Sequence, residues 1–147
     1  MAAERGDVDT LRAHLPKKLD QRNHLGKTLL GCASASRQPY VVKELVSLGA
    51  ATDARMPDGK TPLTYAALGS AYEISETLIA NGASLDTQDE DGVTPLIAAL
   101  SNGATRVAML LIESGADIHI SDNFGNNPRA LCITGSSKRY VMPLLDG

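Results

Sequence analysis

Residues 61–93 read TPLTYAALGSAYEISETLIANGASLDTQDEDGV, and the pattern of this 33-residue stretch recurs on both sides of it. Its first residue, Thr61, has counterparts 33 positions earlier and later in Thr28 and Thr94. Asn127 occupies the same place after a further 33 residues. A fixed period between about 20 and 50 residues is typical of a stacked array of repeats rather than of a single globule.

Each repeat carries the signals of two short helices followed by a polar loop. Thr61 is a good helix N-cap, and Pro62 suits a first helical position because the backbone N–H there has no partner in any case. Gly82 follows a second apolar stretch and is suited to end a helix in the left-handed conformation. Residues 50–60 are polar, and an Asp-Gly dipeptide within them favours a tight turn. Because helices of about 8–10 residues are marginal alone in water, we expect the repeats to be stable only when stacked.

Small and large apolar residues recur at separate positions of the repeat. Alanines allow the first helices to approach closely, and leucines fill the outer layer. The alanines are Ala33, Ala66 and Ala99, and the leucines are Leu45, Leu78 and Leu111. We expect this size difference to curve the stack, with the small residues on the inner side.

We interpret residues 1–147 as one domain of five units. The units span residues 1–27 (partial), 28–60, 61–93, 94–126 and 127–147 (partial). In the last unit Arg129 stands where the others have Leu, and Pro143 predicts a second helix that is short, kinked or frayed. Together with Lys138 and Arg139, Arg129 would give this terminal unit a polar outer face.

The composition excludes several classes of protein. The chain is 43% hydrophobic but only 3% aromatic, and its formal net charge is −3, which offers no basic field for nucleic acid. No apolar run approaches the roughly 18 residues of a membrane span, and the charged N-terminus does not resemble a signal peptide. Cys32 and Cys132 lie in distant repeats, so we expect two buried thiols and no disulfide. We therefore expect an intracellular protein, cytoplasmic, nuclear or both, with no nucleic-acid partner and no membrane insertion.

No motif predicts a cofactor, a metal site or a catalytic residue. The Gly-Lys-Thr runs at residues 26–28 and 59–61 lack the earlier glycine of a phosphate-binding loop and fall in the repeat phase. His14, His24 and His119 are in separate repeats and have no ligand spacing. We interpret them as surface histidines.

The motifs Thr61-Pro62-Leu63 and Thr94-Pro95-Leu96, and the endings Asn81-Gly82-Ala83 and Ser114-Gly115-Ala116, resemble those of the ankyrin repeat. The resemblance covers nearly the whole chain. It implies an all-α solenoid of stacked helix-turn-helix units joined by hairpin or turn loops. The chain departs from the family pattern at the usual His position, which holds Gly31, Thr64, Ile97 and Ala130. The departure removes a hydrogen bond that the family makes between neighbouring units.

The resemblance further implies a non-enzymatic scaffold or adaptor that binds another protein through its loop tips and a concave groove. The predicted loop-tip residues are His24, Leu25, Lys27, Arg55, Met56, Asp58, Lys60, Gln88, Glu90, Asp91, Val93, Ser121, Asn123, Phe124 and Asn126. The predicted groove residues on the first helices are Ser36, Leu68, Ser101 and Asn102.

The residue types at the loop tips leave several interpretations open. Phe124 either folds back onto the neighbouring loop or is an exposed anchor, and Leu25 and Met56 would add apolar contacts along the same edge. The carboxylates at residues 86–91 form either a solvated acidic face or a contact surface for a basic segment of the partner.

Two other functions remain alternatives to the scaffold. The chain could be a regulatory or targeting domain of a larger multidomain enzyme, or its repeats could brace an oligomer. We expect it to be monomeric by itself.

Overall fold

The computed structural model describes residues 19–135 and 137–146, so the helix expected before Pro16 lies outside the described part of the chain. Within that part the chain forms α-helices and turns, with no strand. The helices are α2 (Leu29–Ala35), α3 (Pro39–Ser47), α4 (Pro62–Leu68), α5 (Tyr72–Ala80), α6 (Pro95–Ser101), α7 (Thr105–Glu113), α8 (Pro128–Thr134) and α9 (Lys138–Asp146).

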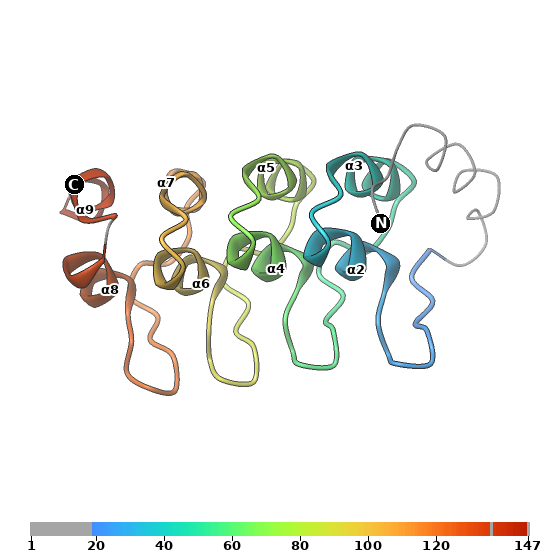
Figure 1. The fold of residues 1–147 in the computed structure, drawn as a ribbon, viewed down its shortest axis with the longest axis horizontal. Coiled ribbons are helices and arrows are strands. Elements are labelled where there is room, and N and C mark those ends of the chain that lie inside the picture. Colours follow the sequence, from blue (N-terminus) through green and yellow to red (C-terminus); the bar gives the residue numbers. More distant parts are fainter. Residues whose placement is uncertain (1–18, 136, 147) are drawn as a thin grey trace.

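The helices form two parallel rows (Figure 1). We call α2, α4, α6 and α8 the inner helices, and α3, α5, α7 and α9 the outer helices. Each inner helix packs against the outer helix that follows it and against the next inner helix. The result is the all-α solenoid that the repeat pattern predicted.

Every inner helix begins at the predicted cap. Thr28, Thr61, Thr94 and Asn127 each accept a hydrogen bond from the backbone N–H three residues later. This contact satisfies one of the donors that a helix start leaves without a partner. The helix starts are therefore encoded locally in each repeat.

The helix ends also follow the sequence. Gly49, Gly82 and Gly115, which follow α3, α5 and α7, have φ angles of 94°, 87° and 101°. Only glycine adopts this left-handed region without a steric penalty, and it breaks the helix there.

The core lies between the two rows and between successive repeats. Ala66, Ala99, Leu78 and Leu111 are fully buried, and their counterparts in α2 and α3 are nearly so. This confirms that the alanines of the inner helices and the leucines of the outer helices lie in the core; Leu30, Leu63 and Leu96 of the inner helices are buried there as well.

The last helix pair bears on the prediction of a helix that is short, kinked or frayed at Pro143. α9 has nine residues, as many as α7, although Pro143 lies inside it. The helix is therefore not short. The exposed Arg129 of α8 pairs with Asp146 of α9 at 2.6 Å, so charged side chains are exposed on this terminal unit.

Four loops project from the inner row on one side of the stack (Figure 1). We call them arms one to four: residues 20–27, 53–60, 86–93 and 119–126. None of the described helices combines the length and apolarity needed to cross a membrane.

Candidate functional site

The four arms share one turn. In each, the backbone N–H of the fourth residue donates to the carbonyl four residues later, with N to O distances of 2.8–3.0 Å. The glycine at the seventh position has a φ angle between 75° and 82°. A side chain would strain the backbone there, so this glycine is required by the turn.

Three arms hold the turn with a side-chain oxygen. In arm three, Oδ1 of Asp89 accepts the backbone N–H groups of Asp91 and Val93, both at 2.9 Å. Asn23 in arm one and Asp122 in arm four make the same pair of contacts. Side chains of this kind stabilise turns by replacing backbone acceptors.

Arm two holds the same turn by other means, because Met56 occupies the position of these acceptors. The Asp58 carboxylate accepts the backbone N–H of Lys60 at 3.1 Å and the hydroxyl of Tyr65 on α4. Burial raises the pKa of Asp58, but these hydrogen bonds outweigh it and the pKa is lowered overall. Burial and the Asp58 carboxylate together raise the pKa of Tyr65, so its hydroxyl stays a donor.

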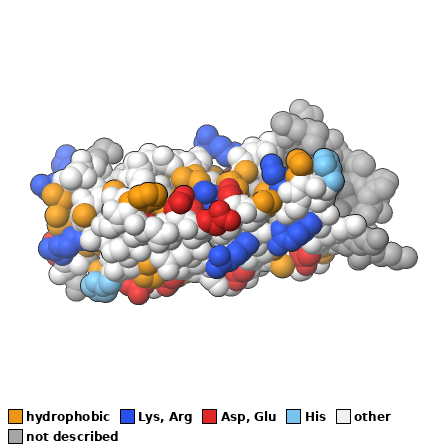
Figure 2. All heavy atoms as spheres, turned by 90° about the horizontal axis from the view of Figure 1, so that it is seen from below, with side chains coloured by type: hydrophobic (Ala, Val, Ile, Leu, Met, Phe, Trp, Pro, Cys, Tyr) orange, Lys and Arg blue, Asp and Glu red, His pale blue; other side chains and the backbone are white. Residues whose placement is uncertain are grey.

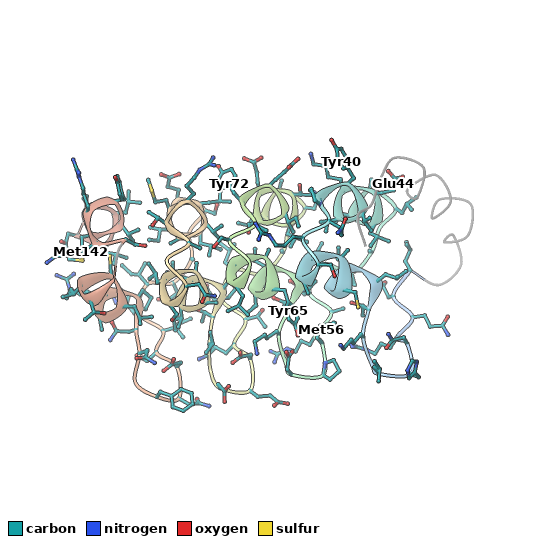
Figure 3. The ribbon with its side chains drawn as sticks, viewed as in Figure 1. Tyr40, Glu44, Met56, Tyr65, Tyr72 and Met142 are labelled. Carbon is teal, nitrogen blue, oxygen red and sulfur yellow. The ribbon has the colours of Figure 1, made fainter. Side chains whose placement is uncertain are left out.

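The prediction that Met56 is an exposed apolar contact is wrong. Its exposed fraction is 5%, and Figure 3 shows it below α2 at the base of its arm. A Cβ placed on Gly31 of α2 would lie only 2.4 Å from the Met56 Sδ. The Met56 side chain therefore fills space that is open only because residue 31 is glycine.

Side chains at equal positions link each arm to the next. The guanidinium of Arg22 donates to the carbonyl of Arg55, that of Arg55 to the carbonyl of Gln88, and the amide of Gln88 to the carbonyl of Ser121. The arms thus form a continuous hydrogen-bonded row.

A second set of contacts runs parallel to this row. The carboxylates of Asp20, Asp53 and Asp86 accept the backbone N–H groups of Ala51, Ser84 and Asp117, each at 2.8 Å. Each of these bonds joins one repeat to the next, 31 residues further along the chain.

A salt bridge joins arms two and three. The Lys60 Nζ lies 3.2 Å from Oδ2 of Asp89 and 3.6 Å from Oδ2 of Asp58. Burial lowers the pKa of Lys60, but the two carboxylates outweigh it and raise the pKa overall. Lys60 is thus a brace between arms rather than a free contact residue.

Arms three and four are in direct backbone contact. The backbone N–H of Asn123 donates to the carbonyl of Asp91 at 2.8 Å, and its side-chain amide donates to the carbonyl of Glu90 at 3.1 Å. A Cβ on Gly92 would lie 2.7 Å from Oδ1 of Asn123. Asn123, predicted as a contact residue, therefore also holds the two arms together.

Most other predicted contact residues are exposed in the described structure. The exposed arm residues are His24, Leu25, Lys27, Arg55, Gln88, Glu90, Asp91, Ser121, Asn123, Phe124 and Asn126. Asp58, Lys60 and Val93 are half-buried, and Val93 packs against the core. The arms therefore bring most of the predicted set onto one face, which Figure 2 views directly.

The structure decides between the two interpretations of Phe124. Its exposed fraction is 73%, larger than the 56% of Leu25, so the ring does not fold back onto a neighbouring arm. Of the three apolar residues expected along this edge, Leu25 and Phe124 are thus exposed and Met56 is not.

The predicted groove residues lie at the ends of the inner helices. Ser36, Leu68, Ser101 and Asn102 are all exposed, and the Asn102 amide donates to the Leu68 carbonyl at 3.0 Å. Helices α2, α4 and α6 contain no charged residue. The exposed charges nearest these three helices therefore lie in the arms and at Arg37, which follows α2.

Several groups that hold the arms are missing from the predicted set, among them the turn acceptors Asn23, Asp89 and Asp122, and also Arg22 and Tyr65. Arg22 could have been found from its spacing, because it lies 33 residues before Arg55. Tyr65 could not have been found in this way, because its position is occupied by Cys32 and Ala98 in the neighbouring repeats.

Neither cysteine of the chain forms a disulfide. Cys132 is buried as expected, and burial raises the pKa of its thiol. Cys32 is half-buried rather than buried, which corrects the expectation for this residue. No three His, Cys, Asp or Glu side chains within residues 19–135 and 137–146 are grouped to hold a metal ion.

Comparison with known families agrees with this architecture. A family model described as ankyrin repeats in three copies matches residues 1–89, and one described as ankyrin repeats in many copies matches residues 78–132. No curated protein matches the chain. The first family match alone spans more than half of the chain, and the helix pairs and arms follow its period. The chain belongs to the ankyrin repeat family.

Proposed function

We propose that this chain is a non-enzymatic scaffold or adaptor that binds a partner protein through its arm tips and the adjoining ends of the inner helices. Ankyrin repeats are generally protein–protein interaction modules. The proposal adds which surface of the chain binds the partner protein.

The observation that carries the proposal is a rigid arm row with exposed side chains. Every described arm is held by its own turn and by bonds to its neighbours, yet residues such as Leu25, Glu90 and Phe124 have no role in the core. A preorganised surface loses little conformational entropy on binding, so modest contacts add up to useful affinity.

The test is to map a bound partner on the chain. A partner captured from the source cell and identified by mass spectrometry would be purified and titrated into isotope-labelled protein, with amide shifts followed by NMR. We expect the largest shifts at arm residues and at the inner-helix ends near Leu68 and Asn102. Shifts confined to the outer helices α3, α5, α7 and α9 would contradict the proposal.

A further inference from the structure

The chemistry of the arm row changes along its length. Arms one and two expose cationic side chains, including those of Arg22, Lys27 and Arg55. Arm three exposes Glu90 and Asp91. Figure 2 shows acidic side chains grouped near the middle of this face, with basic groups on the N-terminal side of them and others at the C-terminal end.

Arm four adds an apolar element next to these carboxylates. Phe124 is the only phenylalanine of the chain, and its ring is 73% exposed. An exposed aromatic on a fixed backbone is typical of residues that anchor a protein interface.

The carboxylates of arm three differ in what they do inside the molecule. That of Asp89 is 2% exposed, pairs with Lys60 and caps the turn. Those of Glu90 and Asp91 make no hydrogen bond or ion pair with any described residue. Their charge is therefore not neutralised by the fold.

The backbones that carry these groups form one braced unit. Asn123, the residue before Phe124, bonds to the carbonyls of both Glu90 and Asp91. The ring and the two carboxylates are thus held on adjacent, mutually bonded tips. Ordering of the backbone on binding costs little at such a site.

From these observations we infer that arms three and four are the docking site for a protein segment that carries a Lys or Arg next to an apolar side chain. The inference rests on the proposed function and names the partner's chemistry. The basic residue pairs with Glu90 and Asp91, and the apolar side chain covers Phe124. A long polybasic segment does not fit, because its ends would meet Arg55 and Arg22 on the cationic arms.

Selection of random peptides displayed on phage against the whole chain tests this site. Bound peptides would be synthesised and their affinities measured by fluorescence anisotropy for the parent chain and for two double variants. The test variant combines Asp91→Lys with Phe124→Ala. The control combines Glu113→Lys with Tyr140→Ala, which likewise reverse an acidic charge and remove an aromatic ring, at exposed residues of the outer helices α7 and α9.

We expect selected peptides to contain a basic residue beside an apolar one, and to bind the test variant at least about tenfold more weakly than the parent or the control. Affinity should fall as salt is raised, because the pairing is between exposed charges. Peptides that are acidic, or that bind the test variant and the parent equally, would overturn the inference. If such peptides still shift arms one and two by NMR, the proposed function stands. If they shift only the outer helices, both proposals fall.

Discussion

Arms two and three have the same backbone turn but different side chains holding it. In arm three Asp89 lies at the fourth position and accepts two backbone N–H groups. In arm two that position is Met56, whose side chain turns inward to Gly31, and Asp58 takes over as the acceptor. The two arms thus have the same turn, but a different side chain accepts its hydrogen bonds.

This difference shows that the stack determines the arm's shape and the local residues supply whichever contacts it needs. The residue facing the fourth arm position is Gly31 on α2, and the same helix position is Thr64 on α4 and Ile97 on α6. Gly31 is paired with Met56 in one repeat. In the next two repeats the larger residues Thr64 and Ile97 are paired with Asp89 and Asp122. We infer that these two positions of the repeat are coupled.

The largest expected effect comes from exchanging this pair. Gly31→Thr forces a side chain against Met56 and should cost about 1–3 kcal/mol of unfolding free energy through overpacking. Met56→Asp removes a buried thioether and should cost about 2–4 kcal/mol. The double variant adopts the chemistry of Thr64 and Asp89, so it should recover about half of the summed loss, with a coupling of about 2–3 kcal/mol.

Urea unfolding of the four proteins in this cycle measures the coupling. If the losses of unfolding free energy in the two single variants simply add in the double variant, Gly31 and Met56 are independent and the inferred coupling is wrong. Gly69→Thr is a useful control, because a Cβ at Gly69 meets its nearest atom at an ordinary 3.4 Å, from the flexible Arg37 side chain.

A smaller effect is expected from removing the carboxylates that hold the turns. Asp122→Ala in arm four should cost about 1.5–3 kcal/mol, because two backbone N–H groups and the Asn126 amide lose a charged acceptor. Asp58→Ala in arm two should cost about half as much, because its carboxylate is 43% exposed and water replaces part of the contact. Thermal and urea unfolding would measure both losses.

The pH dependence of stability gives an independent check on these two residues. Burial raises the pKa of Asp122, but hydrogen bonds from Asn126 and Phe124 outweigh it, so the pKa is lowered overall, as it is for Asp58. A lowered carboxyl pKa contributes stability above the unfolded-state pKa of about 4, and this contribution is lost as the pH falls through the folded-state pKa. The stability difference between the parent and Asp122→Asn should therefore shrink between pH 6 and pH 3. A constant difference would show that the ionised form is not what stabilises the turn.

The smallest effect is expected at the hydroxyl that supports Asp58. Tyr65→Phe removes one hydrogen bond and should cost about 0.5–1.5 kcal/mol. The matched control is Tyr72→Phe on α5, since the Tyr72 ring packs under the Arg106 guanidinium at 4.3 Å and Phe preserves that contact. Equal losses in the two variants would mean that arm two does not depend on Tyr65.

The sequence predicted the features that each repeat encodes within a few residues. Thr61 caps the helix that it begins, and Gly82 follows α5 in the left-handed conformation, because both depend on backbone geometry next to the residue itself. The exposure of most arm residues also followed from the period. The length of α9 could not be predicted in this way, because its packing against α7 and α8 outweighs the local penalty of Pro143.

The candidate site was predicted as a set of arm positions. Its errors occur where an arm side chain can either face solvent or pack against a residue that is distant in the sequence. Met56 and Phe124 are both apolar arm residues, and nothing in the residues beside them says that one is buried and the other exposed. Met56 has an opening opposite it at Gly31, 25 residues earlier in the chain. Phe124 has none, and stays in solvent.

The sequence by itself thus determined the repeat, the helix starts and ends, and the side of the stack on which the arms lie, because these follow from local backbone preferences and from a fixed period. Only the tertiary structure decided which arm side chains brace the row and which are free to bind. That choice depends on contacts between residues about 25–33 positions apart, which come together only when each arm packs against its helices and the repeats stack.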